Sequence, residues 1–445
     1  MTTSDLYLSA IVWMQAGEYA RALRMLEEIK QKGFNDIDPD VVYNSIGAAQ
    51  LKMGGYDEAL DSFTRAQIAK PMPEYAANIA QAYMYKFDPE AAINTCELAL
   101  TEFIDRNSKD LNNIHLKAAS AYDMNREYQS AKHHLRYCDP APDIYVYVGM
   151  KEMQLGNYKN GKLLYQSRAN AYTSLIPNYD SMEFISARGE AISEGTVTVL
   201  LEQGLGDCLM MLPNLLNLCE VYGVFLDIVS IDGRHDAFID DIISAHGHIE
   251  TLGWKKCHSS VVHALRGPFV WMFDLLDEES RFKPCLKVDP QVASLADDCK
   301  DYVGICWRGN PAHQNDYWRS MKIEAMLPLI KSRKCISLQM DLTDHERAFL
   351  KKNGVYVWDK KGLVSLSAIV SKLNSVVTVD TALSHLAGVI GTDCLTMVPT
   401  NSDWRWGIEG ETSRFYGDNH RIVRQETCGD WKPVVEKVYN NLGGK

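Results

Sequence analysis

A glycine-rich turn that ends in an aspartate is the first segment of the sequence whose residues could do chemistry. Gly204 and Gly206 follow a run of apolar and β-branched residues, and glycines there allow a tight turn and close approach of a ligand to the backbone. Asp207 comes next, and its carboxylate could act as a general base on a substrate hydroxyl. The same residue could equally cap the helix that we expect to begin here. The spacing predicts one of these two roles for Asp207.

A second polar segment follows an apolar run that ends near Trp307, and it is rich in hydrogen-bond donors. Arg319 could bind a phosphate through two parallel hydrogen bonds, with Ser320 beside it. A solvated loop with an incidental arginine is the alternative. We expect an oxygen-rich ligand, such as a phosphate or a sugar, against this segment. The residues expected in its substrate cleft are Trp307, Asn310, His313, Asn315 and Asp316.

A third segment places the end of an expected strand directly before a helix. The first backbone N–H groups of a helix have no partner within it, so Ala382, Leu383 and the hydroxyl of Thr381 could bind a diphosphate. His385 lies one helical turn further on and is a candidate for the same site, although a packing role competes for it. Asp380 is expected to serve the turn or cap the helix.

Aromatic residues beside an arginine form the fourth candidate segment. Trp404 and Arg405 could flank a nucleotide base or a sugar, and packing between two halves of the protein is the alternative. The possible metal ligands have simpler explanations. Asp36 and Asp38 resemble a D-x-D motif but lie between two expected helices, where they suit a loop and a helix cap. The histidines at 133 and 134 lie on one expected helix without matching partners. The sequence predicts no metal site.

Short β-branched runs alternate with helical patterns from Gly195 onward, which is typical of parallel α/β folds. We expect one half at residues 195–290 and a second at 300–445, each resembling a Rossmann fold. The four polar segments would then lie at the carboxyl ends of strands, where such folds bind their ligands. The expected strands are residues 196–203, 225–232, 248–252, 301–309, 334–340, 355–359, 375–380 and 394–399.

A repeated motif occupies the first part of the chain. The segment Gly17–Leu23 recurs at Gly54–Leu60, with weaker echoes further along. This pattern predicts four or five tetratricopeptide-like helix pairs over residues 4–172, and an ordinary helical domain is the alternative. A small residue near the start of each second helix would let the two helices approach closely. These small residues are Ala22, Ala59, Ala91, Ala131 and Gly161.

The overall composition is that of a folded acidic protein. Its 445 residues, 46% hydrophobic and 23% charged, are enough for two or three cores. The net charge of −12 argues against a general nucleic-acid binder. Eleven cysteines without a C-x-x-C pair favour reduced thiols and a cytoplasmic location. The sequence shows neither a secretion signal nor an apolar stretch long enough for a membrane span, so we expect neither secretion nor membrane insertion.

Taken together, the four segments resemble one group of enzymes, the tetratricopeptide-containing glycosyltransferases of the two-Rossmann GT-B architecture. The chain is similar to heptosyltransferases of glycosyltransferase family 9 and to bacterial relatives of O-linked N-acetylglucosamine transferase. The resemblance implies an α plus α/β fold, with a helical solenoid followed by an acceptor half and a donor half. It is carried by G-x-G-D-x-L at Gly204–Leu209, G-x-x-W-x-G-N-P at Gly304–Pro311, V-D-T-x-x-x-H-L-A-G at Val379–Gly388 and D-W-R-W at Asp403–Trp406.

The resemblance also implies a role for the candidate residues. Asp207 would deprotonate the acceptor hydroxyl, while Arg319 and the amides of Thr381–Leu383 would hold the diphosphate of the donor and stabilise its departure. The Ser-x-Lys phosphate element of typical heptosyltransferases is not evident, which leaves more of this role to Arg319. The enzyme would use a nucleotide sugar as co-substrate, with no metal or other cofactor, and would invert the configuration of the sugar.

The repeats would present the acceptor, which could be a protein, a glycan or a small molecule. A modified nucleic acid is less favoured because of the net negative charge, and a homodimer through the repeats is a further expectation. Two other functions remain open at this stage. One is an inactive repeat scaffold that binds protein partners, and the other is an epimerase or hydrolase of nucleotide sugars on the same fold.

Overall fold

The structure is a computed structural model that describes residues 2–176, 179, 182, 184, 195–245, 254–257, 268–276, 283–313, 315–360 and 362–442. It divides into two compact units, Met1–Ile144 and Tyr145–Lys445. No helix in the described part of the chain is both long and apolar enough to cross a membrane.

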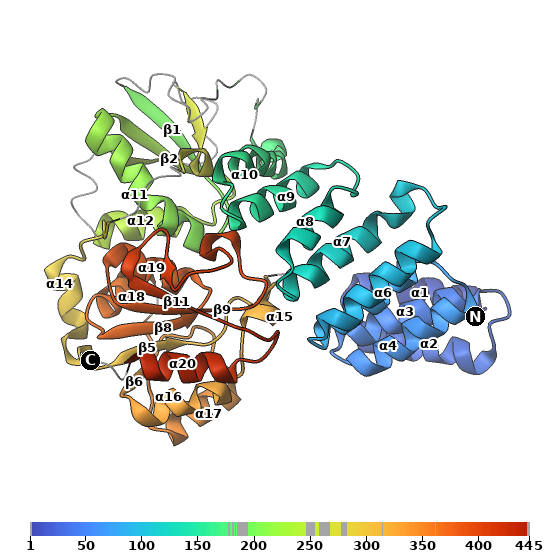
Figure 1. Ribbon diagram of the computed structural model, residues 1–445. Coiled ribbons are helices and arrows are strands. Elements are labelled where there is room, and N and C mark those ends of the chain that lie inside the picture. The colour runs from blue at the N-terminus through green and yellow to red at the C-terminus, as the bar shows by residue number, and fades with distance from the viewer. Residues whose placement is uncertain are drawn as a thin grey trace. The chain divides into compact units, whose positions relative to one another are not determined.

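The first unit is a series of antiparallel helix pairs, as the repeats predict (Figure 1). Close packing within a pair depends on small residues: a methyl group added at Gly47 would lie 2.7 Å from the ring of Phe63 on the next helix. Ala22, Ala59 and Ala131 are fully buried, as expected. The helices are α1 (Thr3–Gln15), α2 (Tyr19–Lys32), α3 (Pro39–Lys52), α4 (Tyr56–Ala69), α5 (Pro73–Tyr85), α6 (Pro89–Glu102), α7 (Ser108–Met124) and α8 (Tyr128–Leu135).

One small residue of the repeat pattern was predicted wrongly. Ala92 is fully buried, whereas Ala91 is partly exposed. The reason is that Pro89 begins α6 in the place that Tyr56 holds in α4. The buried position therefore falls one residue later than the sequence comparison indicated.

The last helix pair lies at the start of the second unit. α9 (Pro142–Gln154) spans the division between the units, and α10 (Tyr158–Tyr165) follows it, with short 3-10 helices η1 (Gln166–Ala171) and η2 (Thr173–Leu175) after it. The two helices touch through backbone, because a methyl group at Gly161 would lie 2.7 Å from the carbonyl oxygen of Gly149. This is the close approach that the sequence predicted for Gly161.

The first sheet of the second unit has the strand order β3-β2-β1-β4 among the described residues, and all its strands are parallel. α11 (Leu205–Tyr222) connects β1 to β2, and α12 (Asp236–Ala245) follows β2. The strand expected at residues 248–252 lies outside the described residues. The observed strands are β1 (Thr196–Leu201), β2 (Phe225–Ser230), β3 (Trp254–Cys257) and β4 (Phe269–Trp271).

The second sheet has the order β10-β11-β9-β8-β5-β6-β7, parallel except for β10. Its first five strands along the chain, β5 to β9, fall at the expected places. Gly417–Arg424 was not expected to be a strand, because its first half is polar and does not alternate. The strands are β5 (Val303–Cys306), β6 (Cys335–Ser337), β7 (Tyr356–Val357), β8 (Ser375–Val379), β9 (Cys394–Val398), β10 (Thr412–Ser413) and β11 (Gly417–Arg424).

Helices cover both faces of the second sheet, with α18 and α19 on one side and α16, α17 and α20 on the other (Figure 1). This is the doubly wound α/β arrangement that the alternation of strands and helices predicts. The helices are α14 (Pro290–Ala293), α15 (Asp316–Arg319), α16 (Leu327–Ser332), α17 (Asp344–Lys352), α18 (Leu363–Val370), α19 (Ala382–Ile390) and α20 (Lys432–Leu442), with 3-10 helices η5 (Met272–Leu275), η6 (Ser294–Cys299), η7 (Ile323–Met326) and η8 (Trp404–Trp406).

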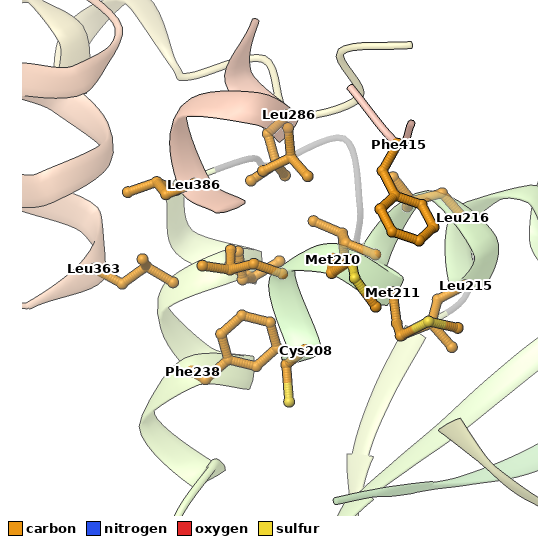
Figure 2. Packing of buried hydrophobic residues seen from close by; sticks show 14 of the residues in the cluster. Cys208, Met210, Met211, Leu215, Leu216, Phe238, Leu286, Leu363, Leu386 and Phe415 are labelled. Carbon is orange, nitrogen blue, oxygen red and sulfur yellow. The ribbon is translucent and has the colours of Figure 1, made fainter. Parts of the chain in front are cut away.

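One hydrophobic core joins the two sheets. Met210 and Leu215 of α11 lie in the same cluster of buried residues as Leu386 of α19, Leu363 of α18 and Phe415 (Figure 2). Burial of apolar surface contributes roughly 25 cal/mol for each Å², so this shared core fixes α11 against α19. The first turns of these two helices carry the glycine-rich segment and the third candidate segment.

Candidate functional site at the carboxyl ends of the strands

The strand order of both sheets marks where a ligand would bind. In each sheet the first strand along the chain lies between the second and the fourth, as β5 lies between β6 and β8 and β1 between β2 and β4. The connection after β5 runs to β6 and the connection after β8 runs to β9, in opposite directions across the second sheet, and open α/β sheets bind ligands at the carboxyl ends of the strands at such a point. Glu202, Trp307 and Asp380 are the residues that follow β1, β5 and β8.

The turn after β1 has a fixed and unusual backbone. Gln203 adopts a left-handed conformation, with φ of 67°, which is uncommon for a residue other than glycine. Its carbonyl oxygen accepts hydrogen bonds from Nε2 of His235 at 3.1 Å and from Nη1 of Arg234 at 3.4 Å. The loop after β2 therefore holds the turn from which α11 begins.

Asp207 is not the N-cap residue that one of the two predicted roles required, because Gly204 holds that position and Asp207 is the third residue of α11, whose carboxylate binds back to Gly204. Its Oδ2 accepts a hydrogen bond from the backbone N–H of Gly204 at 2.8 Å. Its Oδ1 accepts one from Nη2 of Arg405. Both carboxylate oxygens of the proposed base therefore have partners in this structure.

The starts of α11 and α19 lie against each other. A methyl group added at Gly206 would lie 2.8 Å from Cδ2 of His385 and 3.3 Å from Cα of Ala382. The positive ends of two helix dipoles therefore meet in one place, where they favour a negatively charged ligand.

The start of α19 leaves backbone donors for such a ligand. Thr381 is the N-cap residue, and its hydroxyl lies 3.0 Å from Oγ1 of Thr378 rather than capping the helix. Within the described part of the chain, no side chain accepts from the N–H groups of Ala382 or Leu383, whereas the N–H of Ser384 donates to the carbonyl of Thr381. These two amides are the ones that the sequence assigned to a diphosphate.

Arg405 is the most strongly engaged charged group at this place. Its Nη1 donates to Oδ1 of Asp403 at 2.5 Å, and its Nη2 donates to Asp207. The guanidinium carbon lies 4.6 Å from the ring centre of Trp404 and 5.6 Å from that of Phe273. The side chain is only 10% exposed, so both ion pairs are shielded from water.

Burial and the charges around Arg405 shift the pKa values of neighbouring side chains. Burial, reinforced by the charge of Asp403, raises the pKa of Asp380 to about 6, while the charges of Arg319 and Arg405 act in the opposite direction. Burial, with the charge of Arg405, lowers the pKa of His385 well below its ordinary value. His385 is therefore neutral; its Nδ1 lies 2.7 Å from the hydroxyl of Tyr416.

The segment after β5 brings Arg319 and Asp316 together. Nε of Arg319 donates to Oδ1 of Asp316 at 3.1 Å, and the hydroxyl of Ser320 accepts from the N–H of Gly309 at 2.9 Å. Partial burial, followed by the charge of Arg319, lowers the pKa of His313, and Asp403, Asp316 and Asp207 oppose this shift. The charges of aspartates that follow strands of both sheets therefore influence the pKa of His313, whose side chain is exposed.

Several candidates lie elsewhere than the sequence indicated. Trp307 is fully buried, and its Nε1 donates to Oε1 of Glu346 at 2.8 Å, so it belongs to the core of the second sheet. Trp404 is 1% exposed and packs edge-on against Tyr158 and Tyr165, so packing is its role.

Two asparagines of the second segment serve its turn. The side chain of Asn310 accepts from the N–H of Ala312 at 3.0 Å, and the backbone N–H of Asn315 donates to Nδ1 of His313 at 3.2 Å. Both residues are exposed.

A buried ion-pair cluster next to the site was missed by the sequence analysis. Arg168 donates to both carboxylate oxygens of Glu202, at 2.9 and 2.6 Å, and to Asp274 at 3.1 Å. Glu202 immediately precedes the glycine-rich turn, and Asp274 follows β4. Its signal in the sequence was a lone glutamate at the end of an apolar strand, which needs a buried cation.

Two further results concern ligands. Among the described residues, no group of three or more histidine, cysteine, aspartate or glutamate side chains could hold a metal ion. All eleven cysteines are free thiols.

Solved structures similar to this chain include tetratricopeptide-repeat proteins. No protein-family model and no curated protein matches the chain. MamA from residue 41 to the end, of Desulfovibrio magneticus RS-1, is 14% identical and covers 39% of this chain and 97% of its own, with a TM-score of 0.32. A thermophilic tetratricopeptide-repeat protein of Thermus thermophilus is 17% identical and covers 38% and 91%, with a TM-score of 0.32.

A third similar structure is a tetratricopeptide-repeat protein from Parabacteroides merdae ATCC 43184. It is 18% identical and covers 38% of this chain and 72% of its own, with a TM-score of 0.31. Each of these likenesses covers less than half of this chain.

Proposed function

We propose that this protein is a glycosyltransferase that moves a sugar from a nucleotide-sugar donor to an acceptor hydroxyl, without a metal ion and with inversion at the sugar. The observation that carries the proposal is the start of α19. It directly follows β8 at the point where the strand order reverses, and Gly206 brings it against the start of α11, which carries Asp207. This is where a doubly wound sheet would receive a diphosphate, with a carboxylate from the other sheet nearby.

In the proposed reaction, the amides of Ala382 and Leu383 hold the donor diphosphate, and Arg319 and Ser320 add to its binding. The acceptor oxygen attacks the anomeric carbon while the bond from that carbon to the diphosphate breaks. The proton of the acceptor hydroxyl passes to Asp207, and the electron pair of the broken bond leaves with the diphosphate. Hydrogen-bond donors lower the barrier when they bind the diphosphate more strongly as its negative charge develops than they bind it in the intact substrate.

The helical repeats would supply the acceptor. Tandem helix pairs form extended surfaces that suit a protein, a glycan or a small molecule. Eleven free thiols favour a reducing compartment such as the cytoplasm. Self-association through the repeats is part of the proposal and is tested by measuring the mass in solution.

The first experiment is thermal unfolding against a panel of nucleoside diphosphates and nucleotide sugars. A ligand at 100 times its dissociation constant stabilises a protein by roughly 2.7 kcal/mol. We expect one base family to raise the unfolding midpoint, and sugar transfer from that donor to be lost in Asp207→Ala and Arg319→Ala variants that still fold. Cooperative unfolding with no response to any member would contradict the proposal.

A repeat scaffold without catalysis is the second candidate, and one contact favours it. Oδ1 of Asp207 is bound to Arg405, so the carboxylate has no unpartnered oxygen. Under this function the repeats bind partners while no donor sugar is consumed. Free sugar formed without an acceptor would instead indicate a hydrolase on the same fold.

A further inference from the structure

Arg405 connects residues from the two sheets of the second unit. Asp207 belongs to α11, which follows the first sheet's β1, and Asp403 caps η8, which follows the second sheet's β9. One guanidinium nitrogen binds each carboxylate. The face of the guanidinium rests on Trp404 and Phe273, so the side chain keeps a packed position even if one carboxylate is exchanged.

The two oxygens of Asp207 are not equally easy to free. Oδ2 accepts from the N–H of Gly204 as part of the cap that starts α11. Oδ1 accepts only from Arg405 among the contacts in the described part of the chain. Loss of the Arg405 contact would therefore free a proton-accepting oxygen and leave the start of the helix intact.

Arg405 is also close enough to the start of α19 to influence its neighbours. Arg405 binds Asp207, the residue after Gly206, and a methyl group on Gly206 would lie 3.3 Å from Cα of Ala382 in the first turn of α19. The charge of Arg405 opposes the burial that raises the pKa of Asp380 and adds to the burial that lowers the pKa of His385. The amides of Ala382 and Leu383, which would bind a phosphate, lie between Asp380 and His385 in the sequence. Phosphate oxygens can accept two parallel hydrogen bonds from a guanidinium, which a carboxylate bound through one oxygen does not.

We propose that Arg405 is a positioning residue that exchanges Asp207 for a phosphate group of the bound ligand, so that ligand binding itself frees Oδ1 of Asp207. Asp403 keeps its hold on the guanidinium throughout the exchange. The inference rests on the proposed function, since it gives the freed oxygen its use as the base. It also has a consequence that needs no catalysis: Asp207 and the ligand compete for Arg405, so removing either competitor strengthens the binding of the other.

The test measures the dissociation constant of inorganic pyrophosphate by calorimetry for the full chain and its Asp207→Asn variant. We expect pyrophosphate to bind five- to tenfold more tightly to Asp207→Asn. The matched control is Asp297→Asn, which also removes one carboxylate from an ion pair, with Lys372. Lys372 lies before the amino end of β8, whereas the ligand would bind at the carboxyl ends of the strands. The control should therefore leave the dissociation constant unchanged.

A second pair of variants separates release of Arg405 from a simple loss of negative charge. In an Arg405→Gln background there is no guanidinium to release, so Asp207→Asn should change pyrophosphate binding less than twofold. Should Arg405→Gln fail to fold, Arg405→Lys replaces it, and the effect of Asp207→Asn must again be smaller than in the parent. A point charge without the planar fork cannot bind two groups in the same way.

The outcomes distinguish this inference from the proposed function. Equal strengthening by Asp207→Asn with and without Arg405 overturns the exchange, and so does unchanged or weaker binding, or no pyrophosphate binding by either protein. The expected affinities with no turnover of any nucleotide sugar would support the exchange and contradict only the transferase. Sugar transfer by the parent protein, together with an unchanged pyrophosphate affinity in Asp207→Asn, would support the transferase and overturn the exchange.

Discussion

Gly206 lies on α11, which follows a strand of the first sheet, and His385 lies on α19, which follows a strand of the second, yet a methyl group on Gly206 would lie 2.8 Å from Cδ2 of the imidazole. The contact sets how closely the starts of α11 and α19 approach, and the backbone of Gly206 is helical rather than left-handed. The glycine is therefore needed for space between the helices and not for its backbone freedom. From its sequence context this glycine is expected instead to allow a ligand to approach the backbone.

Gly206→Ala tests this role. Alanine is favoured over glycine inside a helix by about 1 kcal/mol, so the change in helix propensity is stabilising. The added methyl group must nevertheless displace His385, which stacks on Trp406 with ring centres 5.2 Å apart. We expect the unfolding midpoint to change little while the affinity for the stabilising nucleotide falls at least fivefold. An unchanged affinity would show that the spacing of the two helices is not critical.

The Arg168–Glu202 ion pair should be necessary for the stability of the second unit. The two side chains are 3% and 0% exposed. Removing one partner of a buried pair costs about 3–5 kcal/mol, because the other charge is left without compensation. Arg168→Met should therefore lower the free energy of unfolding, measured in urea, by that amount. Arg65→Met is the control: its pair with Asp61 is 56% and 62% exposed, and the loss should stay below about 1 kcal/mol.

The fold was largely predictable because its elements have strong local patterns. The strands β5, β8 and β9 are short runs of β-branched and apolar residues that are wholly buried, and the helix pairs repeat their small residues. β11 was not predicted as a strand because polar side chains such as Asn419 and Arg421 interrupt its apolar pattern and remain partly exposed. Pairing with its neighbour β9, rather than its own sequence, makes it a strand.

The site was less predictable because its key contacts join distant residues. Motif spacing indicated Asp207 and Arg405 as polar residues of separate segments, but nothing in either segment shows that they pair. Tryptophans in segments that follow a strand are equally suited to a ligand and to a core, and both Trp307 and Trp404 are in fact buried. Only the three-dimensional arrangement decides between these roles.

A histidine pair in the first unit should make that unit sensitive to acid. Nδ1 of His115 lies 3.1 Å from Nδ1 of His134, whose Nε2 lies 3.1 Å from Oε1 of Glu97. The carboxylate accepts from Nε2, so Nδ1 of His134 is the acceptor for His115. Two positive rings cannot both place a hydrogen between these Nδ1 atoms. Burial lowers the pKa of both histidines below the ordinary 6.5.

The sign of the pH effect follows from these shifts. As the pH falls below about 6.5, the unfolded chain takes up protons that the folded pair resists, so the free energy of unfolding decreases. Other titratable groups at the pair are His133, Tyr122, Tyr137 and Cys138. In His115→Gln the loss of stability between pH 7 and pH 5, followed by helical circular dichroism, should be smaller than in the parent. His345→Gln is the control: its side chain is 72% exposed and its pair with Glu324 is a surface pair worth little, so the slope should change less than in His115→Gln.

Asp380 should have the opposite dependence on pH. Burial and the charge of Asp403 raise the pKa of this carboxyl to about 6, from an ordinary 3.8. As the pH rises through this interval, the unfolded chain releases the proton first, so the parent protein loses stability that an uncharged side chain would keep. Asp380→Asn should therefore unfold at a higher temperature than the parent at pH 7.5 and at nearly the same temperature at pH 3.5.

The control is Asp418→Asn, at an exposed residue of β11, whose stability should stay within about 0.5 kcal/mol of the parent at both pH values. A constant difference between Asp380→Asn and the parent across this range would mean that the carboxyl is compensated by Arg319 and Arg405 after all, and that the four aspartates of the site are balanced without a bound ligand.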